Sequence, residues 1–427
     1  MMMSFIRSSG KSRVAQSAAC AAVAALAIAA FAPETSAQGA PAAATPAPEK
    51  PVNNYWVYVG AESADKLYRL KFGPAGFAVE SSFDIGELPT EMEGPHGLQI
   101  SKDGKFLYMT TGHGFPDGKL WKYALGPDTL VAPGLLLGNF PASLDVTPDG
   151  KYAISANFNV HGDMVPSSQS VVYTPTMTEV ARVVTCTMPH GSRIDPAGRY
   201  QYSGCMMDDE HVQIDARSFK VSKRFSVAKD KEGPIPVEDD AHMLSMWIDG
   251  TKKISKGETA DPAQVGYAAM GGERHIMAPQ TCSPTWAQPS SDGSKVFVTC
   301  NKLDEILEID VAKWALTRRI KTGKGPYNLG VTADGKLLLA TLKAGASFEV
   351  FDIASGKSLA QLKNSSTVAN GVAISADSRY AFVSSEGVGK APGKVDVYDL
   401  RALVNVGTVD VGQQAGGIAF WKQAQAP

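Results

Sequence analysis

The chain has 427 residues, of which 44% are hydrophobic and 20% are charged, and its formal net charge at pH 7 is −2. A chain of this length and apolar content can bury a large core. The near-zero charge, with no basic cluster, argues against nucleic acid or an anionic membrane surface as the main partner.

Residues 1–37 have the order of a secretory signal peptide. Arg7, Lys11 and Arg13 precede an apolar run from 18 to 32, and small residues lead up to Ala37. The run is too short for a membrane span and suits the apolar region of a signal. We therefore expect a periplasmic or secreted protein with no stable membrane span after signal cleavage.

Residues 38–53 form an Ala/Pro-rich segment that we expect to be a disordered linker, because its composition cannot bury enough apolar surface. The rest of the chain, 54–422, is predicted to be one domain. One pattern recurs in it: an apolar strand, a turn that usually holds Asp-Gly, and a second apolar strand. The six copies begin at Gly94, Phe140, Met188, Cys282, Gly325 and Val368.

These copies predict the blades of a propeller. Asp-Gly between alternating apolar residues is a strong hairpin signal, and a third and a fourth strand follow each hairpin. Four antiparallel strands about every 40 to 50 residues form a unit that must stack on its neighbours to bury both faces. The region of about 229–281 lacks a copy, and we expect an insertion there, either a lid, an extra hairpin or a degenerate eighth blade.

A seventh blade is predicted from the two ends of the domain. Residues 55–72 and 78–86 supply a second, third and fourth strand, and residues 415–421 supply the missing first strand. Their pairing would close the ring and leave no exposed sheet edge. The sequence therefore predicts an all-β, seven-bladed β-propeller with four-stranded antiparallel blades.

Turns such as TPDGK and second strands such as KVFVT give the chain a resemblance to the YVTN-repeat β-propellers, which include YncE-like and lactonase-like periplasmic seven-bladed proteins. The resemblance covers nearly all of the domain and implies the fold. It does not choose a function, because such propellers include binding proteins, lactonase-like enzymes, haem-handling proteins and the propeller half of nitrous oxide reductase.

The seven histidines are predicted on one face of the ring, where first strands begin and second strands end. His96 and His190 stand in Pro-His-Gly beside the central channel, and imidazoles converging there would suit a metal. Long loops on this face would also explain their position. The candidate metal ligands are His96, His113, His161, His190, His211, His242 and His275.

Methionines close in sequence to these histidines favour copper, although methionine also fills gaps near loops. No C-x-x-C-H motif for covalent haem occurs. Acidic clusters at 208–210 and 238–240 would serve as cation ligands, as general bases or simply as solvated loops. An anionic or carbonyl ligand over the channel is expected to contact Arg193, Asn157, Asn301 and Asn328.

Four cysteines remain after signal removal. The hairpins bring Cys186 level with Cys205, and Cys282 level with Cys300, which predicts two disulfides that each staple one blade. Thiolate metal ligation is the alternative.

Three functions remain open. The first is a binding propeller with a histidine-rich ligand or copper-type metal site, and with a periplasmic protein as a further partner. The second is a lactonase-like hydrolase that acts over the central channel. The third is a protein-interaction platform.

Overall fold

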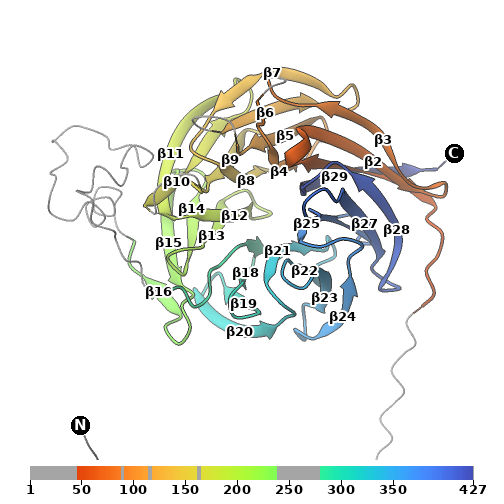
Figure 1. Ribbon diagram of the computed structural model, residues 1–427. Coiled ribbons are helices and arrows are strands. Elements are labelled where there is room, and N and C mark those ends of the chain that lie inside the picture. The colour runs from red at the N-terminus through yellow and green to blue at the C-terminus, as the bar shows by residue number, and fades with distance from the viewer. Residues whose placement is uncertain (1–45, 88–90, 114–117, 161–164, 238–278, 427) are drawn as a thin grey trace, which may run out of the picture. The chain divides into compact units, whose positions relative to one another are not determined.

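The computed structural model describes residues 46–87, 91–113, 118–160, 165–237 and 279–426. Residues 45–427 form one compact unit. Seven antiparallel sheets are arranged around a central axis as the blades of a propeller (Figure 1), as the sequence predicted. The predicted signal peptide and residues 38–45 of the predicted linker lie outside the described residues.

Blades 1 to 7 are numbered along the chain, and each runs from its first, innermost strand outward. Blade 1 contains β29 (Ala415–Gln425), β1 (Asn53–Ala61), β2 (Lys66–Gly73) and β3 (Gly76–Asp84), with a single-turn 3₁₀ helix η1 (Glu62–Ala64). Blade 2 contains β4 (Pro95–Ile100), β5 (Phe106–Thr111), β6 (Lys119–Ala124) and β7 (Thr129–Leu136). Blade 3 contains β8 (Pro141–Val146), β9 (Tyr152–Asn157), β10 (Pro166–Tyr173) and β11 (Thr178–Thr187).

The other four blades follow in order. Blade 4 contains β12 (Pro189–Ile194), β13 (Tyr200–Cys205), β14 (Glu210–Asp215), β15 (Lys220–Ser226) and β16 (Gly233–Ile235). Blade 5 contains β17 (Ala287–Pro289), β18 (Lys295–Cys300), β19 (Glu305–Asp310) and β20 (Ala315–Lys321). Blade 6 contains β21 (Pro326–Val331), β22 (Leu337–Leu342), β23 (Ser347–Asp352) and β24 (Ser358–Lys363), and blade 7 contains β25 (Ala369–Ile374), β26 (Tyr380–Ser385), β27 (Gly393–Asp399) and β28 (Val404–Val411).

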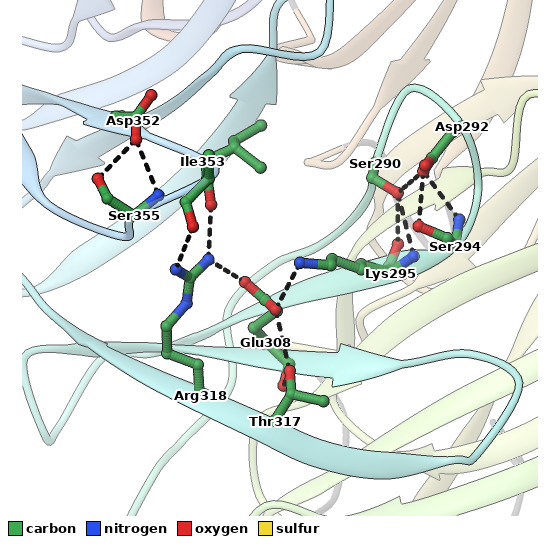
Figure 2. A network of polar contacts seen from close by, with 11 residues as sticks. Ser290, Asp292, Ser294, Lys295, Glu308, Thr317, Arg318, Asp352, Ile353 and Ser355 are labelled. Atoms are coloured by element: carbon green, nitrogen blue, oxygen red, sulfur yellow. Dashed lines mark hydrogen bonds and ion pairs between the residues drawn. The ribbon is translucent and has the colours of Figure 1, made fainter.

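The repeated turn between the first and second strands is held by its own side chains. In blade 5 the hydroxyl of Ser290 donates to Asp292, and the backbone N–H of Ser294 donates to the same carboxylate (Figure 2). These bonds lower the pKa of Asp292 to about 2. Gly293 has φ 71°, a conformation that glycine adopts without steric cost. The Asp-Gly pair therefore fixes the hairpin, as its sequence signal indicated.

The core lies between neighbouring blades. Phe297 of blade 5 packs with Leu338 and Phe351 of blade 6, and all three are fully buried. Polar contacts join the same two blades: Arg318 on β20 donates to the carbonyl oxygens of Ile353 and Ala354 and pairs with the buried Glu308 of its own blade (Figure 2).

We call this contact an inter-blade latch, meaning a cation of one blade that donates to the backbone between the third and fourth strands of the next. It recurs around the ring. Arg69, Lys122 and Lys223 donate to the carbonyl oxygens of Gly126, Thr174 and Val311, at 3.0, 3.0 and 3.2 Å respectively.

The ring closes through blade 1. Strand β29 pairs antiparallel with β1, in a register that places Tyr58 opposite Ala419. In Figure 1 the first and last strands of the domain lie side by side in this sheet. The predicted closure is confirmed, and Trp421 extends it to the next blade by donating to the carbonyl oxygen of Gly104 at 2.9 Å.

Two disulfides join Cys186 to Cys205 and Cys282 to Cys300, and all four residues are fully buried. The pairing is the predicted one, but the prediction that each bond staples a single blade was wrong for the first. Cys186 lies on β11, the fourth strand of blade 3, and Cys205 lies on β13 of blade 4. The chain turns from one blade to the next directly after β11, so this bond locks the junction of two blades.

The predicted insertion begins with a short strand that the sequence pattern did not indicate. Gly233–Ile235 forms β16, which pairs with β15 and makes blade 4 five-stranded. Residues 238–278, which make up most of the predicted insertion, lie outside the described residues.

Candidate functional site at the channel mouth

The first strands of the blades line the central channel. The second residue of each first strand, or in blade 5 the residue two positions before β17, lies at the channel mouth. Irregular pairing re-aims these residues: the register shifts after Pro95, Pro189 and Pro326. A β-bulge of this kind turns a side chain out of the regular alternation of a strand. The corresponding positions in the seven blades are His96, Ala142, His190, Thr285, Tyr327, Asn370 and Gly416.

His96 and His190 meet at this mouth. Their ring centroids are 6.2 Å apart, and their planes are nearly perpendicular at 84°. Nδ1 of His96 lies 2.6 Å from the carbonyl oxygen of Ala142, and Nδ1 of His190 lies 2.9 Å from that of Thr285. A carbonyl can only accept, so each ring carries its proton on Nδ1 and offers the lone pair of Nε2.

His190 is 3% exposed, and its burial lowers the pKa of the imidazole to about 3. The ring is therefore neutral near pH 7 and keeps the lone pair that a ligand or a metal would need. In the structure the hydroxyl of Tyr327 donates to this Nε2 over 3.1 Å. Lys343 in turn lies 4.3 Å from the centre of the Tyr327 ring and forms an ion pair with Glu386 at 2.9 Å.

Glu62 of blade 1 is an acid beside His96 and His113 of blade 2. It is 3% exposed, and its carboxylate lies 3.4 Å from Nε2 of His113 and 3.9 Å from Nε2 of His96. Gln414 donates to it at 3.1 Å. The carboxylate thus sits between two imidazoles, which makes it a hydrogen-bond acceptor or a counter-charge for whatever binds beside them.

Sequence reasoning missed Glu62, Lys343 and Glu386. Each stands directly after the second strand of its blade, the position that Asn301 occupies in blade 5. A comparison of this single position across the repeats would have found them, since charged residues there are out of keeping with the apolar strands that precede them.

The enclosed part of the mouth is small, with room for about 30 Å³ of solvent. That volume holds one or two water molecules or a single ion. Two buried polar atoms on its walls, Nε1 of Trp286 and Oδ1 of Asn328, have no hydrogen-bond partner among the described residues. Such groups cost free energy unless a bound species satisfies them. The principal lining residues, drawn from all seven blades, are His96, Ser143, His190, Trp286, Tyr327, Asn370 and Gly417.

Of the four residues predicted to contact a ligand, two line the channel mouth and two do not. Arg193 and Asn328 line the mouth, and the Arg193 guanidinium lies 4.6 Å from the centre of the Trp286 ring while donating to the carbonyl oxygen of Ser192. Asn157 is buried within blade 3, where its amide donates to two serine hydroxyls. Asn301 donates to the carbonyl oxygen of Pro326 and so connects blade 5 to blade 6.

The predicted histidines do not all lie at the channel mouth. His211 is fully buried between two blades. It stacks on Tyr202 of its own blade, with centroids 5.6 Å apart, and lies 5.5 Å from the ring of Trp314 of blade 5. Its burial lowers the pKa of the imidazole to about 3. Within the described part of the chain, no group of three or more His, Cys, Asp or Glu side chains is arranged to hold a metal ion. His161, His242 and His275 lie outside the described residues.

The methionines described near the site belong to a hydrophobic cluster. Met188, Met206 and Met207 pack with Phe140 and Phe158. The acidic group at 208–210 is also partly structural, because Asp209 accepts hydrogen bonds from the backbone N–H groups that precede blade 5. The second acidic group, 238–240, lies outside the described residues.

Fold and site together define a seven-bladed β-propeller whose channel mouth gathers buried imidazole, carboxylate and cationic groups. The model of the YNCE-like beta-propeller family matches residues 129–416, and the chain belongs to this family. Its membership and its two disulfides are compatible with an extracellular or periplasmic protein. Among the described helices, none has the length and apolar character to cross a membrane.

Two solved structures are similar in fold. A functionally unknown protein from Desulfotomaculum acetoxidans DSM 771 superimposes with a TM-score of 0.58 at 15% identity, covering 86% of this chain and 98% of that one. Hydrazine synthase from Kuenenia stuttgartiensis superimposes with a TM-score of 0.52 at 16% identity, covering 74% of this chain and 80% of that one. No curated protein matches the chain.

Proposed function

We propose that this protein is an exported binding propeller that holds a metal ion of the copper type at its channel mouth, through the Nε2 atoms of His96 and His190. The observation that carries the proposal is the anchoring of both rings: each Nδ1 lies at hydrogen-bond distance from a backbone carbonyl of the neighbouring blade. Histidines that ligate metals are commonly fixed in this way, which leaves Nε2 as the ligand atom. Imidazole is a good ligand for copper.

The surroundings support a small cation. Glu62 and Glu386 supply negative charge at the mouth, and Asn328 supplies an unpartnered oxygen. Tyr327 would release Nε2 of His190 when the ion binds. An enclosed volume of about 30 Å³ suits an ion better than an organic lactone, because pockets for small molecules usually measure about 300 Å³ or more. This favours the binding propeller over a hydrolase.

The test is metal analysis of protein exported to the periplasm and purified without chelator. We expect close to one equivalent of copper in the wild type and its loss in the double variant His96→Ala/His190→Ala. The matched control is Lys151→Ala/Lys336→Ala, which changes two exposed side chains of the hairpin turns and should retain the metal. Copper retained by a folded histidine double variant, or a folded wild type that takes up no copper on titration, would contradict the proposal.

A further inference from the structure

A second and larger pocket lies between blades 2 and 3, among the hairpin turns. It measures about 310 Å³ and is lined by residues of both blades, which is the size of a small-molecule site. Its inner wall includes Phe106, Tyr108 and Lys122, of which Tyr108 is 1% exposed and Lys122 is 7% exposed. The exposed Asp103 and Asp149 stand on the two turns that flank it.

Lys122 differs from the other inter-blade latches because it is nearly buried and has no ion pair among the described residues. Lys223 forms no such ion pair either, but it is more exposed. Arg69 forms ion pairs with Asp128 and Glu80, and Arg318 forms one with Glu308. Lys122 makes the same kind of bond to the carbonyl oxygen of Thr174, at 3.0 Å, but it has no carboxylate partner among the described residues. Its ammonium is therefore a nearly buried charge without an ion pair among the described residues, and the exposed Asp103 at the pocket opening stabilises it only from a distance.

The surroundings of this ammonium compensate it only in part. Its nitrogen lies 4.3 Å from the centre of the Phe106 ring and 5.7 Å from that of Tyr108. Aromatic faces stabilise a cation, but by less than a buried anion does. Burial lowers the pKa of Lys122, which is the consequence of that incomplete compensation. An anion in the pocket would supply the partner that Asp128 and Glu308 supply elsewhere.

We propose that the pocket between blades 2 and 3 binds a small organic carboxylate with an aromatic body, with the carboxylate on Lys122. The rings of Phe106 and Tyr108 and the side chains of Pro148 and Pro175 provide apolar surface for the body. Asp103 and Asp149 are exposed and already committed to their turns, where Ser101 and Thr147 donate to them at 2.6 Å. They exclude ligands with a second negative charge at the opening.

The binding test uses benzoate as the probe, titrated into the full exported protein and followed by calorimetry at low ionic strength. We expect saturable binding that Lys122→Met weakens about tenfold or more and that Lys122→Arg keeps within about threefold, because the charge is retained. Acetate and benzylamine, which lack the ring or the negative charge, should bind more weakly than benzoate. Equal binding of either one, or undiminished benzoate binding by folded Lys122→Met, would overturn the proposal.

A second measurement needs no variant and covers the case in which Lys122→Met does not fold. Acetic anhydride labels the wild-type protein with and without benzoate, and mass spectrometry reads each lysine. Benzoate should reduce the labelling of Lys122. The labelling of Lys336, an exposed lysine on the turn between β21 and β22 of blade 6, should not change. Equal labelling of Lys122 in both samples would refute the site. The pair His96→Ala/His190→Ala should bind benzoate as the wild type does, so the result is independent of the channel-mouth metal.

Discussion

The hydroxyl of Tyr327 in blade 6 donates to Nε2 of His190 in blade 4, over 3.1 Å and between groups that are both buried. The bond spans the channel mouth, because blade 5 lies between the two blades that it connects. It also engages the ring nitrogen of His190 that Thr285 does not contact.

Replacement Tyr327→Phe should lower the free energy of unfolding by about 1 to 2 kcal/mol, since it leaves a buried nitrogen without its donor. Urea denaturation measures the change. The matched control is Tyr123→Phe, whose hydroxyl makes no hydrogen bond among the described residues and whose loss should cost less than about 0.5 kcal/mol. Equal effects of the two variants would show that the contact with His190 contributes nothing.

Acid should destabilise the protein between pH 6.5 and pH 4. Burial lowers the pKa of His190 and His211 from 6.5 to about 3, so in this range the unfolded chain binds more protons than the folded one and stability rises with pH. Burial raises the pKa of Asp208 to about 7, which opposes this because the folded state holds that proton. Two histidine protons are gained on unfolding and the Asp208 proton is lost, so the unfolded state binds one proton more than the folded state.

Asp208→Asn should therefore steepen the acid dependence by up to about 1.4 kcal/mol per pH unit. Asparagine keeps the oxygen that accepts from the backbone N–H of Thr187. Urea midpoints at a series of pH values provide the measurement. A slope identical to that of the wild type would mean that Asp208 is ionised in the folded state across this range.

The latch at Arg318 should contribute more than an exposed ion pair. Arg318→Met leaves the buried Glu308 with fewer partners and frees two carbonyl oxygens of blade 6, so we expect a loss of about 2 kcal/mol. Lys324→Met, which removes an exposed pair with Asp304, should have a much smaller effect. Thermal unfolding of both variants tests this, and similar melting temperatures would contradict it.

Each disulfide should stabilise the fold by about 3 kcal/mol. They close loops of 19 and 18 residues, for which the loss of chain entropy in the unfolded state predicts nearly equal effects. The variants Cys186→Ala/Cys205→Ala and Cys282→Ala/Cys300→Ala can be compared by denaturation. A much larger loss for the first pair would show that fastening blade 3 to blade 4 adds to the entropic effect.

The sequence predicted the fold well because strand alternation recurs along the domain and the Asp-Gly turn, a local signal, recurs in blades 2, 3, 5 and 6. The pairing of Cys186 with Cys205 also followed from local spacing. Its placement did not, because the spacing does not reveal that β11 belongs to the preceding blade. Closure of the ring by residues 415–421 could be inferred because only this segment was left to form the missing first strand of blade 1.

The candidate site was predicted less completely. His96 and His190 were found through Pro-His-Gly, which marks the innermost edge of a blade. His211 stands at the same end of its sheet, but the third strand lies away from the channel and directs the ring between Tyr202 and Trp314. Asn157 likewise points into its own blade. Position along a strand is visible in the sequence, whereas the direction of the side chain depends on the register and the bulges.

Because β1 pairs with β29, the ring can close only after the C-terminal strand has been synthesised. Glu62 and Gln414, which meet at this seam, are 352 residues apart in the sequence. A chain made from its amino end must therefore carry an incomplete first blade, with the edge of β1 unpaired, until its final strand emerges. During that interval the edge can recruit other chains. Strand β29 therefore covers the edge of β1, and loss of residues 415–427 should expose this edge, which can then pair with other chains and aggregate.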